Sequence, residues 1–132
     1  MTALLDTDVV IHLRDGDSWT EDQVRRLSPP LFISAITRIE LENGIWREPE
    51  WANLRRRSLA QLLVVVTTLP FGHDEIAAYQ RILELAGFSK RKIADRMTAA
   101  TALVHDLPLV TFNGRDFRDI QELSLIDWAR PE

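Results

Sequence analysis

The chain opens with the stretch Ala3-Leu4-Leu5-Asp6-Thr7-Asp8, an apolar run that stops at a carboxylate. A short apolar run has the length of a buried strand, whereas Asp and Thr are preferred at the starts of helices. The stretch therefore predicts a strand over residues 3–6 that passes directly into a helix over about 7–13. At this junction Asp6 and Asp8 have two open interpretations, as helix caps or as ligands.

Short apolar runs and helical periodicity alternate along the rest of the chain, and turns such as Ser28-Pro29-Pro30 separate them. The runs are rich in Val, Leu and Ile on both faces, as in a parallel sheet that is buried between helices. We therefore predict a single domain over residues 1–132 of the α/β class: a doubly wound, mainly parallel sheet of about five strands with helices on both faces. The other expected strands are 31–34, 63–69, 109–112 and 123–126, and the other expected helices are 21–27, 35–46, 52–61, 74–86 and 91–105.

Composition narrows the chemistry of any metal site. The 132 residues are 45% hydrophobic, which suits one compact domain, and there is no cysteine to form a disulfide or a thiolate site. The three histidines are not spaced like a zinc motif, so oxygen ligands and therefore Mg²⁺ or Mn²⁺ are expected. No secretory signal precedes the first strand and no apolar run reaches the ~18 residues of a membrane span, so we expect a cytoplasmic protein without a membrane partner.

Three further acids share the predicted position of Asp6. Glu40 lies about a turn into the helix after the second predicted strand, and Asp95 lies near the start of the last long helix. Asp116 follows the fourth predicted strand by a short turn. In a parallel α/β sheet, helix starts and strand ends lie at one edge, where such folds bind their ligands. We therefore expect all four acids to face one crevice.

Each acid alone has an ordinary structural interpretation. An acid in a first helical turn, such as Asp95, is favoured by the helix dipole by about 0.3–1 kcal/mol, and Asp116 suits a turn. Glu40 shares a helical face with Ile36 and Ile39, which favours a role beyond solvation. Four carboxylates in one crevice would repel each other and raise each other's pKa, unless a cation neutralised them. Gly44, on the face of Glu40, suggests the close approach of another backbone.

Arginine dominates the basic residues although the net charge is −4. The only lysines are Lys90 and Lys92, so fourteen of the sixteen basic residues are arginine, the side chain best suited to bidentate phosphate contacts. The cluster Arg55-Arg56-Arg57 is equally consistent with a solvated helix face. Basic residues also flank two of the acids, and we expect three of them to contact RNA: Arg91, Arg96 and Arg115.

With these residues in place, the chain resembles the PIN-domain ribonucleases, and in particular the VapC-type toxins of bacterial type II toxin–antitoxin systems. The resemblance covers nearly the whole length and implies a Mg²⁺-dependent endoribonuclease, with Mn²⁺ as a substitute, whose metal-bound water hydrolyses a phosphodiester. It is carried by Leu4 to Asp8, by Ile33 to Leu41 with Gly44, by Asp95 to Asp106, and by Val110-Thr111 with Asn113 and Arg115-Asp116-Phe117. It assigns the catalytic and metal-binding quartet to Asp6, Glu40, Asp95 and Asp116.

Two positions depart from the family pattern. Asp8 stands where the family usually has Asn, which adds an acid beside the first ligand. Some relatives carry the last acid where this chain has Asn113, so Asn113 and Asp116 share that assignment, with the ionised Asp116 ahead. Thr111, Asn113 and Asp8 are the secondary site candidates.

The resemblance also implies partners. RNA is the expected substrate, with tRNA as one candidate, and a cognate VapB-like antitoxin is the expected inhibitor of a likewise expected homodimer. An acidic crevice would accept an arginine of the antitoxin in place of the metal. Trp46 and Trp51 would offer an aromatic anchor to an amphipathic partner helix. For Trp46, ordinary core packing between helices is an equally open interpretation.

Two other functions fit part of the same pattern. The stretch Leu4 to Val10 also matches the Asp-x-Asp-x-Val motif of haloacid-dehalogenase-like phosphatases, in which Asp6 would be the nucleophile and Asp8 the acid. That interpretation leaves Glu40 and Asp95 without roles. A receiver-like, Mg²⁺-binding signalling module would need an acceptor Asp after the third strand, where this chain has Thr67-Thr68.

Overall fold

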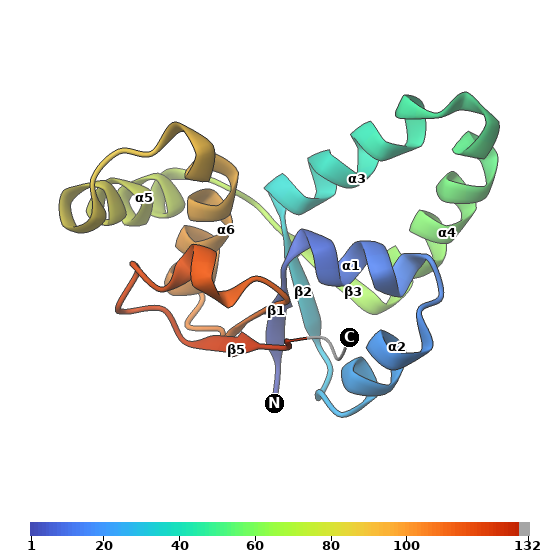
Figure 1. Ribbon diagram of the computed structural model, residues 1–132, viewed down its shortest axis with the longest axis horizontal. Helices are drawn as coiled ribbons and strands as arrows, with labels where there is room; N and C mark the ends of the chain where they lie inside the picture. The colour runs from blue at the N-terminus through green and yellow to red at the C-terminus, as the bar shows by residue number, and fades with distance from the viewer. Residues whose placement is uncertain (130–132) are drawn as a thin grey trace.

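A computed structural model describes residues 1–129 of the chain and contains one five-stranded sheet (Figure 1). Its order is β3-β2-β1-β4-β5 and every neighbouring pair is parallel. The α/β, doubly wound class predicted from the sequence is therefore confirmed. The strands are β1 Ala3–Leu5, β2 Leu31–Ser34, β3 Val66–Leu69, β4 Leu109–Thr111 and β5 Leu125–Asp127.

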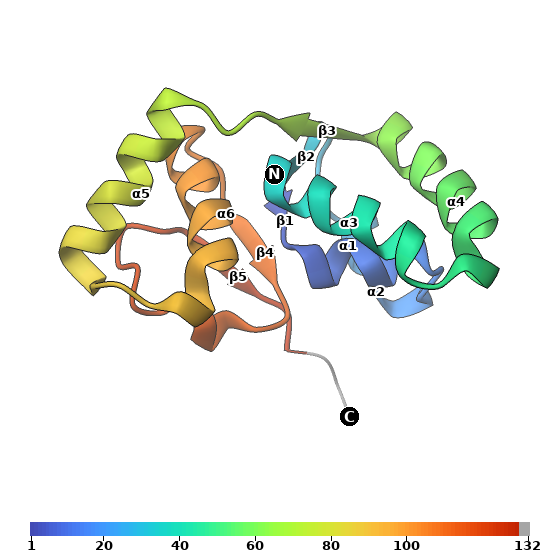
Figure 2. The same ribbon diagram turned by 90° about the horizontal axis from the view of Figure 1, so that it is seen from above.

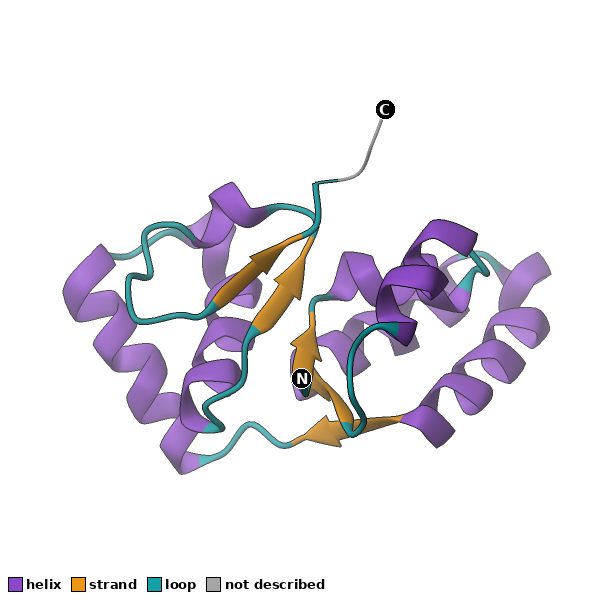
Figure 3. Ribbon diagram, turned by 90° about the horizontal axis from the view of Figure 1, so that it is seen from below, coloured by secondary structure: helices purple, strands orange, loops and turns teal. Residues whose placement is uncertain are grey.

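Helices connect the strands and cover both faces of the sheet, as Figure 3 shows by colour. Most begin within a residue or two of the predicted positions, and the side chains of Asp6 and Ser34 cap two of them. One helix begins three residues earlier than predicted, where Asp17 accepts a hydrogen bond from Thr20 N. The α-helices are α1 Thr7–Arg14, α2 Ser18–Arg25, α3 Ala35–Arg47, α4 Ala52–Val65, α5 His73–Ala86 and α6 Ile93–Val104, and the 3₁₀ turns are η1 Pro49–Trp51, η2 Lys90–Lys92 and η3 Gly114–Phe117.

The hydrophobic core has two halves, one on each face of the sheet. Helices α1, α3 and α4 contribute Val9, Leu41 and Leu59 to one half, and α5 and α6 contribute Ile82 and Ala99 to the other. Viewed from above, α5 and α6 lie on one side of the strands and α1 to α4 on the other (Figure 2). The central strands β1 and β4 are buried throughout, which explains why their runs read as continuously apolar.

The predicted strand 63–69 is wrong in its first half. Residues 63–65 continue α4, and pairing with β2 begins only at Val66, which lies opposite Leu31. The side chains of Val64 and Val65 are exposed although their branched shape favours strands. An uninterrupted apolar run hides the change from helix to strand, because no Gly, Pro or cap separates the two elements.

This topology gathers the ends of β1 and β4 and the first turns of α1, α3 and α6 at one edge of the sheet. Parallel strands present their carboxyl ends together, and the helices that follow them begin there. Within residues 1–129, no helix combines the length and apolarity needed to cross a membrane.

Candidate active site

Asp6 lies between the end of β1 and the first turn of α1, where it caps the helix. One carboxylate oxygen, Oδ1, accepts a hydrogen bond from Thr7 N at 2.9 Å, and Oδ2 accepts one from Thr111 Oγ1 at 2.8 Å. Burial raises the pKa of Asp6 to about 7 from the usual 3.8, and the nearby negative charges of Asp95 and Asp8 add to the rise. The two hydrogen bonds lower this pKa but do not outweigh burial.

Glu40 lies in the second turn of α3, at the same edge of the sheet, and it is exposed to solvent. Its Oε1 accepts a hydrogen bond from Thr7 Oγ1 at 2.7 Å, so a residue next to Asp6 orients it. The expected apolar surroundings of Glu40 are found only in part, because Ile36 is buried whereas Ile39 is 58% exposed. Gly44 is approached by the guanidinium of Arg14 rather than by another backbone, since a Cβ there would lie 3.7 Å from Arg14 Nη1.

Asp95 lies in the first turn of α6 and is partly buried. Burial is the largest cause that raises the pKa of Asp95 to about 6 from the usual 3.8. The negative charges of Asp116, Glu40 and Asp8 also raise it, whereas the positive charge of Arg91 lowers it. Two of the predicted quartet therefore hold protons more tightly than free carboxylates do, partly because of their acidic neighbours.

Asp116 is presented by the turn η3, which follows β4. Phe117, 1% exposed, anchors this turn, and a Cβ on Gly114 would overlap the carboxylate of Asp127. Asp116 Oδ1 lies 3.7 Å from the exposed Arg91 Nη1. In the same segment, Asn113 Nδ2 donates a hydrogen bond to Asp8 Oδ2 at 2.7 Å. Asp8, which stands where the family usually has Asn, is therefore bonded to Asn113, the alternative to Asp116 for the last acidic position.

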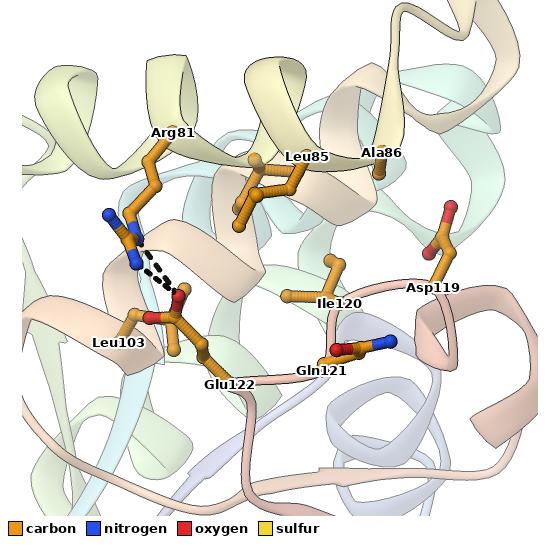
Figure 4. Close-up of a pocket in the computed structure, with 9 residues that line it drawn as sticks. Arg81, Leu85, Ala86, Leu103, Asp119, Ile120, Gln121 and Glu122 are labelled. Atoms are coloured by element: carbon orange, nitrogen blue, oxygen red, sulfur yellow. Dashed lines mark hydrogen bonds and ion pairs between the residues drawn. The ribbon is translucent and has the colours of Figure 1, made fainter.

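One cleft of about 520 Å³ contains all four predicted acids together with Asp8 and Asn113. Thr111 lies beneath it, buried and bonded to Asp6. A second, smaller cavity lies between α5, α6 and residues 119–122 (Figure 4). Its acids already have cationic partners, because Arg81 binds Glu122 at 2.7 Å and Arg96 binds Asp119 at 3.0 Å. The acidic cleft is therefore the candidate active site.

Comparison with known proteins agrees with this geometry. The PIN domain family matches residues 3–123. The chain is 33% identical over 133 residues to Ribonuclease VapC1 of Rickettsia felis, with 96% of each chain covered. The chain belongs to the PIN-domain family. It is also 31% identical over 138 residues to Ribonuclease VapC of Rickettsia bellii, again with 96% of each chain covered, so it is a VapC-type PIN domain.

Solved structures show the same relationship. The structure of VapBC-1 from nontypeable Haemophilus influenzae superposes with a TM-score of 0.82 at 25% identity, covering 98% of this PIN domain and 100% of that chain. The resemblance inferred from the sequence is thereby confirmed at the level of family and fold.

The donor set of this PIN domain fits a hard divalent cation. Within residues 1–129, no three side chains of metal-binding type form a ready-made cage. Mg²⁺, however, is usually held by one or two carboxylates and keeps several waters, so it needs no such cage. The negative charges of Asp116, Glu40 and Asp8 raise the pKa of Asp95 in one open cleft, and such a concentration of carboxylates matches that mode of binding.

The three arginines predicted to contact RNA differ in this PIN domain. Arg91 and Arg115 are exposed. Arg96 is 2% exposed, donates to Gly87 O and binds Asp119, so its prediction as an RNA contact is wrong. Its sequence neighbours suggested an accessible cation, but its carboxylate partner, Asp119, lies 23 residues further along the chain.

Sequence reasoning missed several cleft residues of this PIN domain. Thr7 was considered only as a cap, although its hydroxyl binds Glu40. Arg14 and Arg47 also line the cleft. Arg14 follows Thr7 by seven residues in α1, and Arg47 follows Glu40 by seven residues in α3, so this spacing on one helical face is the signal that could have found them. Arg55 separates from its basic cluster, because it donates to Gly44 O at 2.8 Å and pairs with Glu48 at 3.1 Å.

Proposed function

We propose that this PIN domain is a Mg²⁺-dependent endoribonuclease, with Mn²⁺ as a substitute, and acts as the toxin of a toxin–antitoxin pair. The observation that carries the proposal is the convergence of Asp6, Glu40, Asp95 and Asp116 in one cleft. The relatives named Ribonuclease VapC support the same reaction.

In this proposal Asp6, Glu40, Asp95 and Asp116 hold the metal, and Asp8 adds charge beside them. The bound metal supplies an activated water and neutralises charge on the phosphate. Thr7 N and Thr111 Oγ1 orient the two oxygens of Asp6, while Thr7 Oγ1 orients Glu40. A cleft carboxylate accepts the proton of the attacking water. Arg91 and Arg115, exposed beside Asp116, contact the phosphates of the RNA.

The test is cleavage of RNA by purified protein in defined metals. We expect cleavage with Mg²⁺ or Mn²⁺ and none after EDTA, with recovery when Mg²⁺ is returned in excess. Asp95→Asn protein from the same preparation scheme controls for contaminating ribonuclease. Cleavage that persists in EDTA, or that the Asp95→Asn protein retains, would contradict the proposal.

Neither rival function explains the cleft as well. A phosphatase with Asp6 as the nucleophile leaves Glu40 and Asp95 without roles, although both line the cleft with Asp6. Receiver domains have the sheet order 2-1-3-4-5, whereas this sheet has the order 3-2-1-4-5.

A VapB-like antitoxin is the proposed partner, because the solved relative from Haemophilus influenzae is VapBC-1 rather than VapC alone. We propose that it docks beside the cleft on α3, η1 and α4, where Trp46, Trp51 and Leu54 are exposed by 67%, 49% and 50%. Trp46 is too exposed to belong to the core of residues 1–129. The guanidinium carbon of Arg56 lies 4.9 Å from the centroid of its ring. A groove of about 360 Å³ between Trp51, Leu54 and Arg14 adjoins the acidic cleft, so one antitoxin segment can reach both. A homodimer is proposed as the assembled form.

A further inference from the structure

Four hydroxyl side chains lie at the base of the acidic cleft, and they come from four different elements. Thr7 belongs to α1, Ser34 ends β2, Thr37 belongs to α3 and Thr98 belongs to α6. Ser34 and Thr37 are fully buried and Thr98 is 2% exposed. Buried hydroxyl groups are costly unless they are hydrogen-bonded, so their partners are informative.

The partners form one continuous chain that ends at Glu40. Thr98 Oγ1 lies 3.0 Å from Ser34 Oγ, and Ser34 Oγ donates to Thr37 Oγ1 at 3.3 Å. Thr37 Oγ1 lies 2.9 Å from Thr7 Oγ1, which in turn donates to Glu40 Oε1 at 2.7 Å. This hydroxyl chain thus links α6, which carries Asp95, to α3, which carries Glu40.

Each hydroxyl has one proton to donate, and this sets the direction of every hydrogen bond in the hydroxyl chain. An ionised carboxylate only accepts hydrogen bonds, so Thr7 must donate its single hydroxyl proton to Glu40. Thr37 must then donate to Thr7, and Ser34 to Thr37. Because Ser34 donates its one hydroxyl proton to Thr37, Thr98 must be the donor to Ser34 Oγ, which also accepts from Thr37 N at 3.1 Å. Every hydroxyl therefore donates toward Glu40.

We propose that Thr98, Ser34, Thr37 and Thr7 are positioning residues that hold the Glu40 carboxylate in its metal-binding orientation. Glu40 is exposed, so packing alone does not fix its side chain. Hydrogen bonds that point the same way polarise one another, and the terminal bond to the carboxylate gains the most. The inference rests on the proposed metal-dependent function, because that function gives the orientation of Glu40 its importance.

The first experiment measures Mn²⁺ affinity by electron paramagnetic resonance. Loss of partners that orient metal ligands typically weakens metal binding by about 10–100-fold. We expect Thr7→Val to weaken binding by about tenfold or more, and Thr37→Val and Thr98→Val by smaller factors in that order. Thr37→Ser keeps the hydroxyl and should restore affinity close to that of the unmodified protein.

Thr101→Val is the matched control. Thr101 is also fully buried in α6, three residues after Thr98, but its hydroxyl donates to Met97 O within the helix. We expect its Mn²⁺ affinity to stay within about twofold of the unmodified protein. Equal losses in Thr98→Val and Thr101→Val, or unchanged affinity in Thr7→Val, would overturn the inference.

A second experiment needs neither metal nor RNA. Tm is measured in EDTA for Thr98→Val, Glu40→Ala and the double variant. The hydroxyl chain links Thr98 to Glu40, so we expect Tm shifts that do not add, whereas Thr101→Val and Glu40→Ala should add. Additive shifts for both pairs would overturn the inference. A protein that neither binds Mn²⁺ nor cleaves RNA would contradict the proposed function, and this cycle would still decide the hydroxyl chain.

Discussion

At the scale of single residues, the carboxylate of Asp6 serves the fold and the cleft together. It caps α1 and accepts a hydrogen bond from Thr111, yet burial raises its pKa to about 7. We expect Asp6→Asn to reduce cleavage by more than roughly 100-fold, beyond the usual effect of outer-shell partners. It should also raise the Tm of metal-free protein, because the amide keeps an acceptor for Thr7 N while removing one repelling charge.

Asp95→Asn should behave in the same way, because it also relieves repulsion, whereas Asp8→Asn should be milder since it restores the residue usual in the family. Calorimetry in EDTA and an RNA cleavage assay check both effects. An Asp6 or Asp95 variant that unfolds would show that this acid is mainly structural.

The same carboxylates predict how stability depends on pH. The pKa values of Asp6 and Asp95 are raised in the fold to about 7 and about 6, above the unfolded 3.8, so the fold binds protons more tightly than the unfolded chain. This contribution is complete below about pH 4 and is lost as the pH rises to about 7. We expect the Tm of metal-free protein to be higher at pH 5 than at pH 8, by on the order of 5 °C.

Asp6→Asn should flatten this pH profile, and Mg²⁺ should raise Tm more at pH 8 than at pH 5, because it replaces protons on the acids. Differential scanning calorimetry in EDTA and in Mg²⁺ measures both. A metal-free Tm that rises from pH 5 to pH 8 would contradict the raised pKa values.

At the scale of elements, Arg96 connects α6 to the loops on either side of it. It donates to Gly87 O after α5 and to Asp119 after η3, and Lys92 lies 3.3 Å from the same carboxylate. Burial raises the pKa of Asp119, but the hydrogen bonds from Arg96 and Lys92 outweigh it and lower that pKa. We expect Arg96→Met to destabilise the fold by about 2 kcal/mol, as for a hydrogen bond to a charged group.

Arg91→Met is the matched comparison, since Arg91 is exposed and its pair with Asp116 spans 3.7 Å. Arg91→Met should leave the midpoint of unfolding in urea unchanged. Combined with Asp95→Asn, which we expect to prevent cleavage, it should weaken RNA binding. Unfolding in urea and filter binding separate the two variants. If Arg91→Met lost stability and Arg96→Met did not, the roles of these arginines would be reversed.

At the scale of the whole molecule, the groove beside Trp51 and Leu54 adjoins the acidic cleft, so one partner can cover both. We expect co-expression with a neighbouring small open reading frame to relieve growth arrest caused by this chain. Trp51→Ala should weaken antitoxin binding by about tenfold or more, as truncation of an aromatic anchor does.

Leu85→Ala is the control for this prediction, because Leu85 is also exposed but lies on α5, on the opposite face of the sheet. Binding is measured by calorimetry with purified antitoxin. Growth arrest that persists would contradict the partner, and unchanged binding by Trp51→Ala would contradict the docking surface.

The sequence alone determined the parallel sheet, the edge that gathers its strand ends and helix starts, and the four acids that meet there. These features depend on signals carried within a few residues: apolar runs of strand length, helical periodicity and caps such as Asp6. In a parallel sheet the topology then places helix starts and strand ends together, so local signals suffice to predict a shared crevice. The four acids do line one cleft, whereas their role in binding metal remains a prediction.

Only the tertiary structure decided which side chains are accessible and what they bind. Arg96 is buried and paired with Asp119, whereas Trp46 is 67% exposed. The hydroxyl chain depends on a contact between Ser34 and Thr98, 64 residues apart, and Thr111 binds Asp6 across 105 residues. Such partners are brought together by packing of the whole chain, and no local pattern records them, because burial is a property of distant neighbours.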